Sequence, residues 1–334
     1  MNTRYATWAI VLAAGDGARL SALTTDERGD NVPKQFCSLN GGPSLLQKAL
    51  QRALCIVPRE RVCAIVARRH ERHWQHAFSS LPARNVIVQP RNCGTAIGVL
   101  LGLLRILERD PLARVVFLPS DHYVQHDALF ADSVRAAALP SARGSDNVTL
   151  AGIEPDNVDP ELGYILPEGP VHSGLRRVTR FVEKPTATVA RHLIGRGAVW
   201  NTFIFWARAM TLLTLIRRRL PEVVDVMADA LARDWRRDHG TVALAEVYER
   251  LPSVDFSRSV VQGAESELRV STLPACGWTD LGTPGRVVQA LQRLRSTSAI
   301  WSSDAPVGLS APVVLASRVE AFAPAKHQYA ERMQ

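Results

Sequence analysis

The first residues in this sequence that could take part in chemistry form a glycine turn followed by basic residues. An apolar run ends at "AAGDGAR" within residues 11–36, which close on "PKQF". Gly15 and Gly17 let the backbone come close to a ligand, so that consecutive N–H groups can point at phosphate oxygens. Arg19 and Lys34 supply positive charge nearby. We expect a phosphate-binding turn, although a tight turn with incidental basic residues would explain any one of these residues alone.

This turn differs from two common phosphate motifs. The pattern GxxxxGK[ST] of the P-loop is absent, and "GDGARL" has Leu20 where the dinucleotide fingerprint has its third glycine. A nicotinamide dehydrogenase is therefore the weakest of the enzyme alternatives.

A carboxylate follows a second apolar run, in "FLPSDHYV". Asp121 in this position can hold Mg²⁺, which takes one or two carboxylates together with substrate phosphate oxygens. An isolated Asp more often caps the following turn, so both interpretations stay open. No second histidine stands at ligand spacing from His122, which is expected to orient or pack.

The third stretch, "RFVEKP", ends an expected strand with Glu183 and Lys184 before Pro185. A carboxylate can accept hydrogen bonds from paired sugar hydroxyls, and an ammonium can bind a phosphate. A surface ion pair is the alternative for any adjacent Glu and Lys.

These residues need a scaffold that brings them together. Short, nearly continuous apolar runs at 7–13, 61–67, 85–89, 114–120 and 147–153 are typical of buried strands, and 44–57, 95–110 and 128–139 have helical periodicity. The alternation predicts an α/β fold with a mainly parallel, doubly wound, Rossmann-like sheet flanked by helices. Strands and helices after residue 155 predict a smaller second lobe. Ligands bind such sheets at the carboxyl ends of the strands.

The overall composition is that of a folded chain. Its 334 residues are 46% hydrophobic and 22% charged, with a net charge of +8. Such a charge could suggest a nucleic acid, an anionic membrane surface or a polyanionic small substrate, and because the arginines are dispersed, a nucleic acid is the less favoured explanation. No apolar segment is long enough to span a membrane. Five scattered cysteines without a CxxC pair argue against a disulfide framework or zinc site, and predict a reduced cytoplasmic protein.

Seven motifs in order resemble one enzyme family. They are "AAGDGARL…PKQF", "QPRNCGTA", "FLPSDHYV", "GIEPDNVDPELGYI", "RFVEKP", "VWNTFIF" and "GWTDLGTPGRV". The set resembles the sugar-1-phosphate nucleotidyltransferases, and within them the mannose-1-phosphate guanylyltransferase (GDP-mannose pyrophosphorylase) branch. The resemblance covers residues 8–294, most of the chain.

The resemblance implies a reaction and a set of site residues. A phosphate oxygen of mannose 1-phosphate attacks the α-phosphorus of GTP in line, giving GDP-mannose and pyrophosphate with the help of Mg²⁺. The nucleotide-binding residues it implies are Ala14, Gly15, Asp16, Gly17, Arg19, Lys34, Gln89, Gly94 and Thr95. The sugar-binding residues are Gly163, Tyr164, Glu183, Lys184 and Asn201, and the metal ligands are Asp121 and Asp280. Arg19, Lys34, Lys184, Asp121 and Asp280 form the catalytic set.

The same resemblance implies a domain plan. Residues 1–295 would form the nucleotidyltransferase domain, with a nucleotide half to about 155 and a sugar-binding half from 156. Residues 296–334 are expected to be an irregular tail without a β-helix or isomerase domain.

Several alternatives remain open at this level. Ala14 replaces a usual glycine of the turn, Asp26, Glu27 and Asp30 add negative charge to the following loop, and Thr202 replaces a usual serine. The same chemistry with another hexose 1-phosphate or nucleoside triphosphate is the close alternative. A non-catalytic nucleotide-sugar sensor is the remote one, and the oligomeric state is open, a homodimer included.

Overall fold

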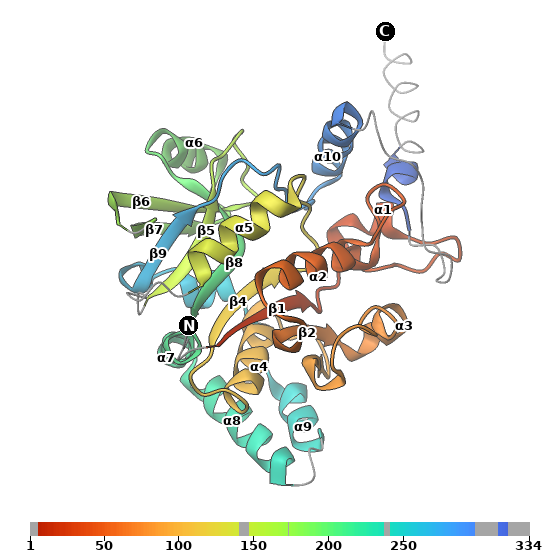
Figure 1. Ribbon diagram of the computed structural model, residues 1–334, viewed down its shortest axis with the longest axis vertical. Helices are drawn as coiled ribbons and strands as arrows, with labels where there is room; N and C mark the ends of the chain where they lie inside the picture. Colours follow the sequence, from red (N-terminus) through yellow and green to blue (C-terminus); the bar gives the residue numbers. More distant parts are fainter. Residues whose placement is uncertain (1–5, 140–146, 173, 237–240, 298–312, 320–334) are drawn as a thin grey trace.

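A single mixed sheet organises the chain. The computed structural model describes residues 6–139, 147–172, 174–236, 241–297 and 313–319 (Figure 1). In this part of the chain, a sheet of 9 strands has the order β3-β2-β1-β4-β8-β5-β9-β7-β6. Its strands are β1 Thr7–Ala13, β2 Val62–Ala67, β3 Val86–Gln89, β4 Arg114–Pro119, β5 Val148–Ile153, β6 Gly163–His172, β7 Leu175–Glu183, β8 Val199–Arg208 and β9 Leu268–Thr272.

The α/β class is confirmed, but the expectation of a mainly parallel sheet is not: in the described residues four strand pairs are parallel, three of them at one end of the sheet and the fourth between β5 and β9, and five pairs are antiparallel. Strands β3, β2, β1 and β4 are mutually parallel, with Ile10 opposite Cys63 on one side and Phe117 on the other. Strand β8 lies antiparallel to both β4 and β5, and β6 pairs antiparallel with β7. The short connection from β6 to β7 explains that pairing, because a parallel crossover needs a dozen or more residues.

Helices cover both faces of the sheet. They are α1 Ser21–Thr24, α2 Leu45–Ile56, α3 Glu71–Trp74, α4 Thr95–Leu107, α5 Asp127–Ala138, α6 Ala187–Gly195, α7 Ala209–Arg219, α8 Pro221–Arg236, α9 Val242–Arg250 and α10 Pro284–Thr297 (Figure 1). Helix α2 begins at a capping box, in which Ser44 accepts from the Gln47 N–H at 3.2 Å and Gln47 accepts from the Ser44 N–H at 2.8 Å.

The two-residue period of the strands separates two apolar cores. Ala9 and Val11 of β1 face one core, to which α2 and α5 contribute. Trp8 and Ile10 face the other, which contains the apolar side of α4 and residues of α7, α8 and α9. Successive strand side chains point to opposite faces, so β1 is buried on both sides and its carboxyl end is held in place from both.

Part of the C-terminal segment packs against the loop after the glycine turn. Leu315 is fully buried and donates its N–H to the Ser38 carbonyl at 2.9 Å, and residues 315–319 are helical. The rest of the expected irregular tail, 298–312 and 320–334, lies outside the described residues. Among the helices of the described ranges, none has both the length and the apolar character required to cross a bilayer.

Candidate functional site

A cleft of about 340 Å³ lies where β1, β4, β7 and β8 present their polar residues. It is lined by most of the residues that the sequence singles out: Ala14, Gly15, Gly17, Arg19, Gln89, Gly94, Thr95, Asp121, Gly163, Glu183, Lys184, Asn201 and Asp280. They come from segments far apart in the chain, and the sheet order brings them together. Lys34 lies buried beside this cleft, whereas the Asp16 and Tyr164 side chains are engaged elsewhere.

The glycine turn is closed by the "PKQF" segment. The Gln35 side-chain amide donates to the carbonyls of Ala13, at 3.2 Å, and Gly15, at 2.8 Å. Gly17 has φ +64°, and a Cβ there would lie 2.7 Å from the Lys34 backbone nitrogen, so only glycine fits. Ala14 needs no such freedom, because it is not among the described non-glycine residues with positive φ. The replacement of a glycine by Ala14 is therefore compatible with the turn.

The Asp16 side chain contacts other residues of the protein and does not line the cleft. Its carboxylate pairs with Arg69 and lies 3.4 Å from the His70 Nε2, while Asn92 donates to its second oxygen at 3.1 Å. These contacts anchor the turn to the segments that follow β2 and β3. The backbone of Asp16 remains part of the turn expected to bind phosphate.

Lys34 links the two aspartates that are expected to hold a metal ion, through the carboxylate of one and the backbone of the other. Its ammonium lies 2.9 Å from the Asp121 carboxylate and donates to the Asp280 carbonyl at 2.6 Å. Burial raises the pKa of Asp121, but the Lys34 ammonium and His122 outweigh it and hold that pKa below its usual range. Burial acts in the same way on Asp280, whose pKa is held low by His122, Arg286 and Lys34. Both carboxylates are therefore ionised at neutral pH.

The charges around these carboxylates fit a divalent cation. Burial lowers the pKa of His122 to about 4, so its ring is neutral at pH 7. Three carboxylates, of Asp121, Asp280 and Asp159, then face two cations, Lys34 and Arg286, which leaves one negative charge. Two ionised carboxylates on one cleft are the ligands that Mg²⁺ prefers. The described residues hold no group of three or more His, Cys, Asp or Glu side chains that could hold a metal ion.

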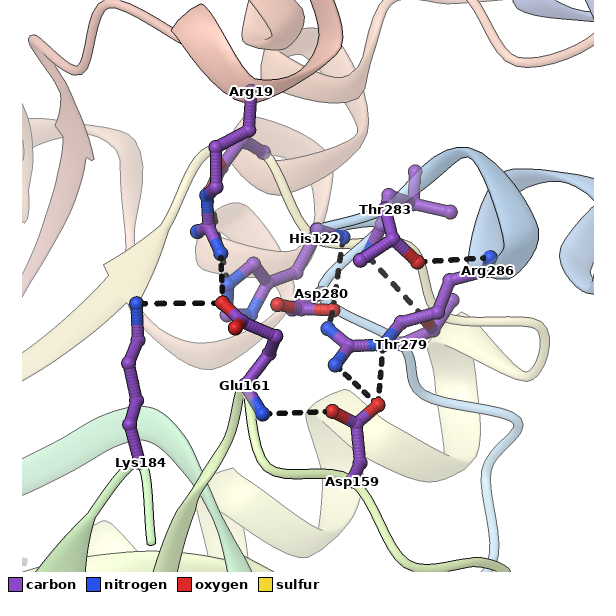
Figure 2. A network of polar contacts seen from close by, with 12 residues as sticks. Arg19, His122, Asp159, Glu161, Lys184, Thr279, Asp280, Thr283 and Arg286 are labelled. Carbon is purple, nitrogen blue, oxygen red and sulfur yellow. Dashed lines mark hydrogen bonds and ion pairs between the residues drawn. The ribbon is translucent and has the colours of Figure 1, made fainter. Parts of the chain in front are cut away.

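Two cations from opposite sides of the cleft meet at one carboxylate. Glu161 Oε2 lies 3.4 Å from the Arg19 guanidinium and 3.7 Å from the Lys184 ammonium (Figure 2). Arg19 comes from the glycine turn, and Lys184 follows β7 with a left-handed φ of 50°. All three side chains are partly exposed, so an incoming anion can reach both cations.

A second pair of carboxylates lies near Lys184. Burial, together with the negative charge of Asp255, raises the pKa of Glu183 to about 7, and Lys184, Arg258 and Ser257 offset only part of this. A Cβ on Gly163 would lie 2.6 Å from the Glu183 carboxylate, which explains the glycine before Tyr164. Tyr164 itself is fully buried, and its hydroxyl donates to the Asp159 carbonyl at 3.0 Å. Its ring therefore does not line the cleft.

The remaining wall follows β3. Gly94 has φ +84° and precedes α4, and a Cβ there would lie 2.4 Å from the Val254 carbonyl. Thr95 accepts from the Phe256 N–H at 2.8 Å. Gln89 lines the cleft, and its buried Oε1 has no hydrogen-bond partner in the described ranges. A buried acceptor without a partner is uncommon in folded proteins, which makes Gln89 a candidate for contact with a ligand donor.

Sequence reasoning missed several residues of this region. They include Glu161, Asp159, Arg286, Asp255 and Gln35. Glu161 and Arg286 do lie inside the motifs "DPELGYI" and "GTPGRV", so their place in those motifs was the available signal. Asp255 lies in no motif, and only the tertiary structure brings it to the cleft.

The chain resembles known proteins in sequence and in structure. A sequence profile of the family described as Nucleotidyl transferase matches residues 8–297. The xanthan biosynthesis protein XanB of Xanthomonas campestris pv. campestris is 30% identical over 286 residues, covering 82% of this chain and 57% of that protein. A mannose-1-phosphate guanylyltransferase 2 of Escherichia coli O157:H7 is 27% identical over 288 residues, covering 82% of this chain and 58% of that protein. The chain thus spans somewhat more than half the length of the curated relatives it matches.

One solved structure resembles the chain more fully. It is a crystal structure described as mannose-1-phosphate geranyltransferase from Thermus thermophilus. The two structures align with a TM-score of 0.71 and 31% sequence identity, covering 87% of this chain and 79% of the other.

Proposed function

The chain belongs to the nucleotidyl transferase family, and on that premise we propose that it transfers the guanylyl group of GTP to mannose 1-phosphate. The products are GDP-mannose and pyrophosphate. The observation that carries this proposal is the convergence of Arg19 and Lys184, from opposite sides of the cleft, on Glu161. Two polyanions must approach each other in this reaction, and a cation on each side offsets their repulsion.

The nucleotide would bind along the glycine turn. Ala14, Gly15 and Gly17 of this turn line the cleft with Arg19 and would face the triphosphate, and Gln89, whose Oε1 has no partner in the described residues, would contact the base. Guanine carries hydrogen-bond donors on its Watson–Crick edge. Gly94 and Thr95, at the start of α4, complete the base wall.

The sugar would bind on the other side, in the smaller lobe expected from the sequence. Glu183 and Asn201 accept hydrogen bonds from sugar hydroxyls, Gly163 leaves room for them, and Lys184 binds the sugar phosphate. In this proposal the nucleotide half is 1–155 and the sugar half is 156–295. The phosphate oxygen of the sugar then attacks the α-phosphorus in line, and pyrophosphate leaves. No protein nucleophile is required, because such transfers depend on positioning and charge neutralisation.

Asp121 and Asp280 would hold Mg²⁺, which neutralises phosphate charge when bound. Lys34 then does two things. It keeps Asp121 ionised and fixed, and it anchors the Asp280 backbone beside it. The five free cysteines also support our expectation of a reducing, cytoplasmic setting.

A panel of sugar 1-phosphates and nucleoside triphosphates, followed by pyrophosphate release, tests the proposal. GTP with mannose 1-phosphate should be among the best pairs. Turnover with a different pair would show that the proposed substrates are wrong. If no pair is turned over, the proposal that the protein is an enzyme is contradicted.

The Asp280→Ala variant tests the role of the carboxylates. It should bind GDP-mannose and fail to turn over, whereas the matched Asp156→Ala variant, whose carboxylate pairs with Arg293 on the exposed side of α10, should keep its activity. If Asp280→Ala turns over like the wild type, the metal assignment is wrong.

A further inference from the structure

Arg286, at the start of α10, joins two parts of the cleft wall that are distant in sequence. Its Nε donates to Asp159 Oδ2 at 2.8 Å, and its Nη2 contacts the same oxygen. Its Nη1 pairs with Asp280 Oδ1 (Figure 2). The Arg286 and Asp280 side chains are both only 11% exposed, and Asp159 is 18% exposed. The three groups form a largely buried, charge-assisted network.

The backbone fixes each carboxylate in turn. Asp280 Oδ1 also accepts the Gly282 N–H at 3.0 Å, and Asp159 Oδ1 accepts the Glu161 N–H at 2.9 Å. The Arg286 fork therefore reaches the backbone of the loop that carries Glu161. The same loop is also held by the Tyr164 hydroxyl, which accepts the Asp159 N–H at 3.0 Å.

The two carboxylate oxygens of Asp280 differ in their contacts. Arg286 and the Gly282 N–H both bind Oδ1. This leaves Oδ2 as the oxygen that Asp280 can offer to a cation in the cleft. Residues that orient a metal ligand in this way affect metal affinity although they never touch the metal.

We propose that Arg286 is a positioning residue: it sets the Asp280 carboxylate for a divalent cation and, through Asp159, sets Glu161 between Arg19 and Lys184. The inference rests on the proposed function for the presence of the cation. A lysine cannot take its place, because only the planar guanidinium reaches two carboxylates at once with a fixed geometry.

Direct titration of the substrate-free protein with Mn²⁺, by calorimetry or by the electron paramagnetic resonance of free Mn²⁺, tests this without any turnover. We expect the Mn²⁺ dissociation constant to rise about 10- to 100-fold in Arg286→Met. Arg286→Lys should weaken Mn²⁺ binding about tenfold, because the charge is kept and the fork is lost. The matched control is Arg293→Met on the same helix, where the arginine pairs with Asp156 and is 44% exposed; its Mn²⁺ binding should equal that of the wild type.

A second variant guards against a failure to fold. Arg286→Met leaves Asp159 buried without its cation, and Arg286→Met/Asp159→Asn removes that charge as well. The double variant should still bind Mn²⁺ more weakly, since Asp280 has still lost its partner. In steady-state assays of both variants, the fold decrease in kcat should exceed the fold increase in KM for either substrate.

Three results would overturn the inference. Mn²⁺ binding like that of the wild type in both variants would show that Arg286 does not set Asp280. Tighter Mn²⁺ binding in Arg286→Met would show that Arg286 acts only through its charge. Weakening that vanishes after correction for the folded fraction would make Arg286 merely structural. A wild type that binds Mn²⁺ but turns over no substrate would contradict the proposed function and leave this inference standing.

Discussion

Glu183 is expected to make the protein less stable as the pH rises through neutrality. Burial and the neighbouring Asp255 raise the pKa of this carboxyl from 4.5 to about 7. Because the folded pKa lies above the unfolded one, the folded protein binds the additional proton between these values. The stabilisation is complete below the unfolded pKa, and it is lost as the pH rises through the folded pKa.

The size of the effect follows from the shift. A rise from 4.5 to about 7 corresponds to roughly 3 kcal/mol, at about 1.4 kcal/mol per pKa unit. Since Glu183 is half-buried and partly screened by solvent, we expect about 2 kcal/mol. Glutamine has the shape of the protonated acid and does not titrate. Glu183→Gln should therefore match the wild type near pH 4.5 and be about 2 kcal/mol more stable at pH 8.

Urea unfolding of both proteins at a series of pH values between 4.5 and 8 measures this difference. Glu168→Gln on β6 is the matched control, because that side chain is 64% exposed and lies 3.9 Å from Arg177. Its stability should follow that of the wild type within about 0.5 kcal/mol at every pH.

The same titration should appear in substrate binding with the opposite sign. The ionised Glu183 accepts sugar hydroxyls better than the acid does, so the KM for mannose 1-phosphate should fall as the pH rises through about 7. Glu183→Gln should show no such step. If the unfolding free energies of Glu183→Gln and wild type stay parallel from pH 4.5 to 8, the pKa reasoning is refuted.

Four further variants test separate parts of the structure. Lys184→Ala should raise the KM for sugar phosphate about 10-fold or more and leave that for nucleotide nearly unchanged, because it removes one charge-assisted hydrogen bond. Glu161→Gln should lower both KM values about 2- to 5-fold by releasing two exposed ion pairs of 3.4 and 3.7 Å. Gly94→Ala should cost at least about 2 kcal/mol of stability, since φ is +84° and the new Cβ would meet Val254. Asp234→Ala should cost about 1–3 kcal/mol without changing kcat, because this buried carboxylate accepts two N–H groups at the start of α9. Substrate kinetics measure the first two variants, and urea unfolding the others.

A specific result would contradict each of these four predictions. Equal effects of Lys184→Ala on both KM values would contradict its assignment to the sugar phosphate. Higher KM values in Glu161→Gln would mean that Glu161 itself contacts a substrate. Gly94→Ala with unchanged stability would refute the close approach to Val254, and Asp234→Ala with unchanged stability would show that α9 does not need this cap.

Local patterns predicted the elements well because local interactions encode them. The apolar run at 7–13 is β1 with the same bounds, and the helical period at 95–110 is α4, which ends at Leu107. Strand β8 lies antiparallel between β4 and β5, a placement that the sequence pattern does not predict. Strand direction depends on which distant strands pair, and residue periodicity carries no information about that.

The amino-acid sequence supplies the residue types of this site: a glycine turn, Asp121 after one apolar run and a Glu-Lys pair after another. Which charged side chains contact one another depends on the three-dimensional arrangement of the strands. This arrangement brings Lys34 to Asp121 and Asp280, buries Tyr164 away from the cleft, and pairs Arg286 with an aspartate 127 residues away. The difference arises from the distance along the chain over which each kind of interaction acts. Backbone periodicity and turn preferences act within a few residues, whereas an ion pair forms only where the order of the strands places two side chains within a few ångströms.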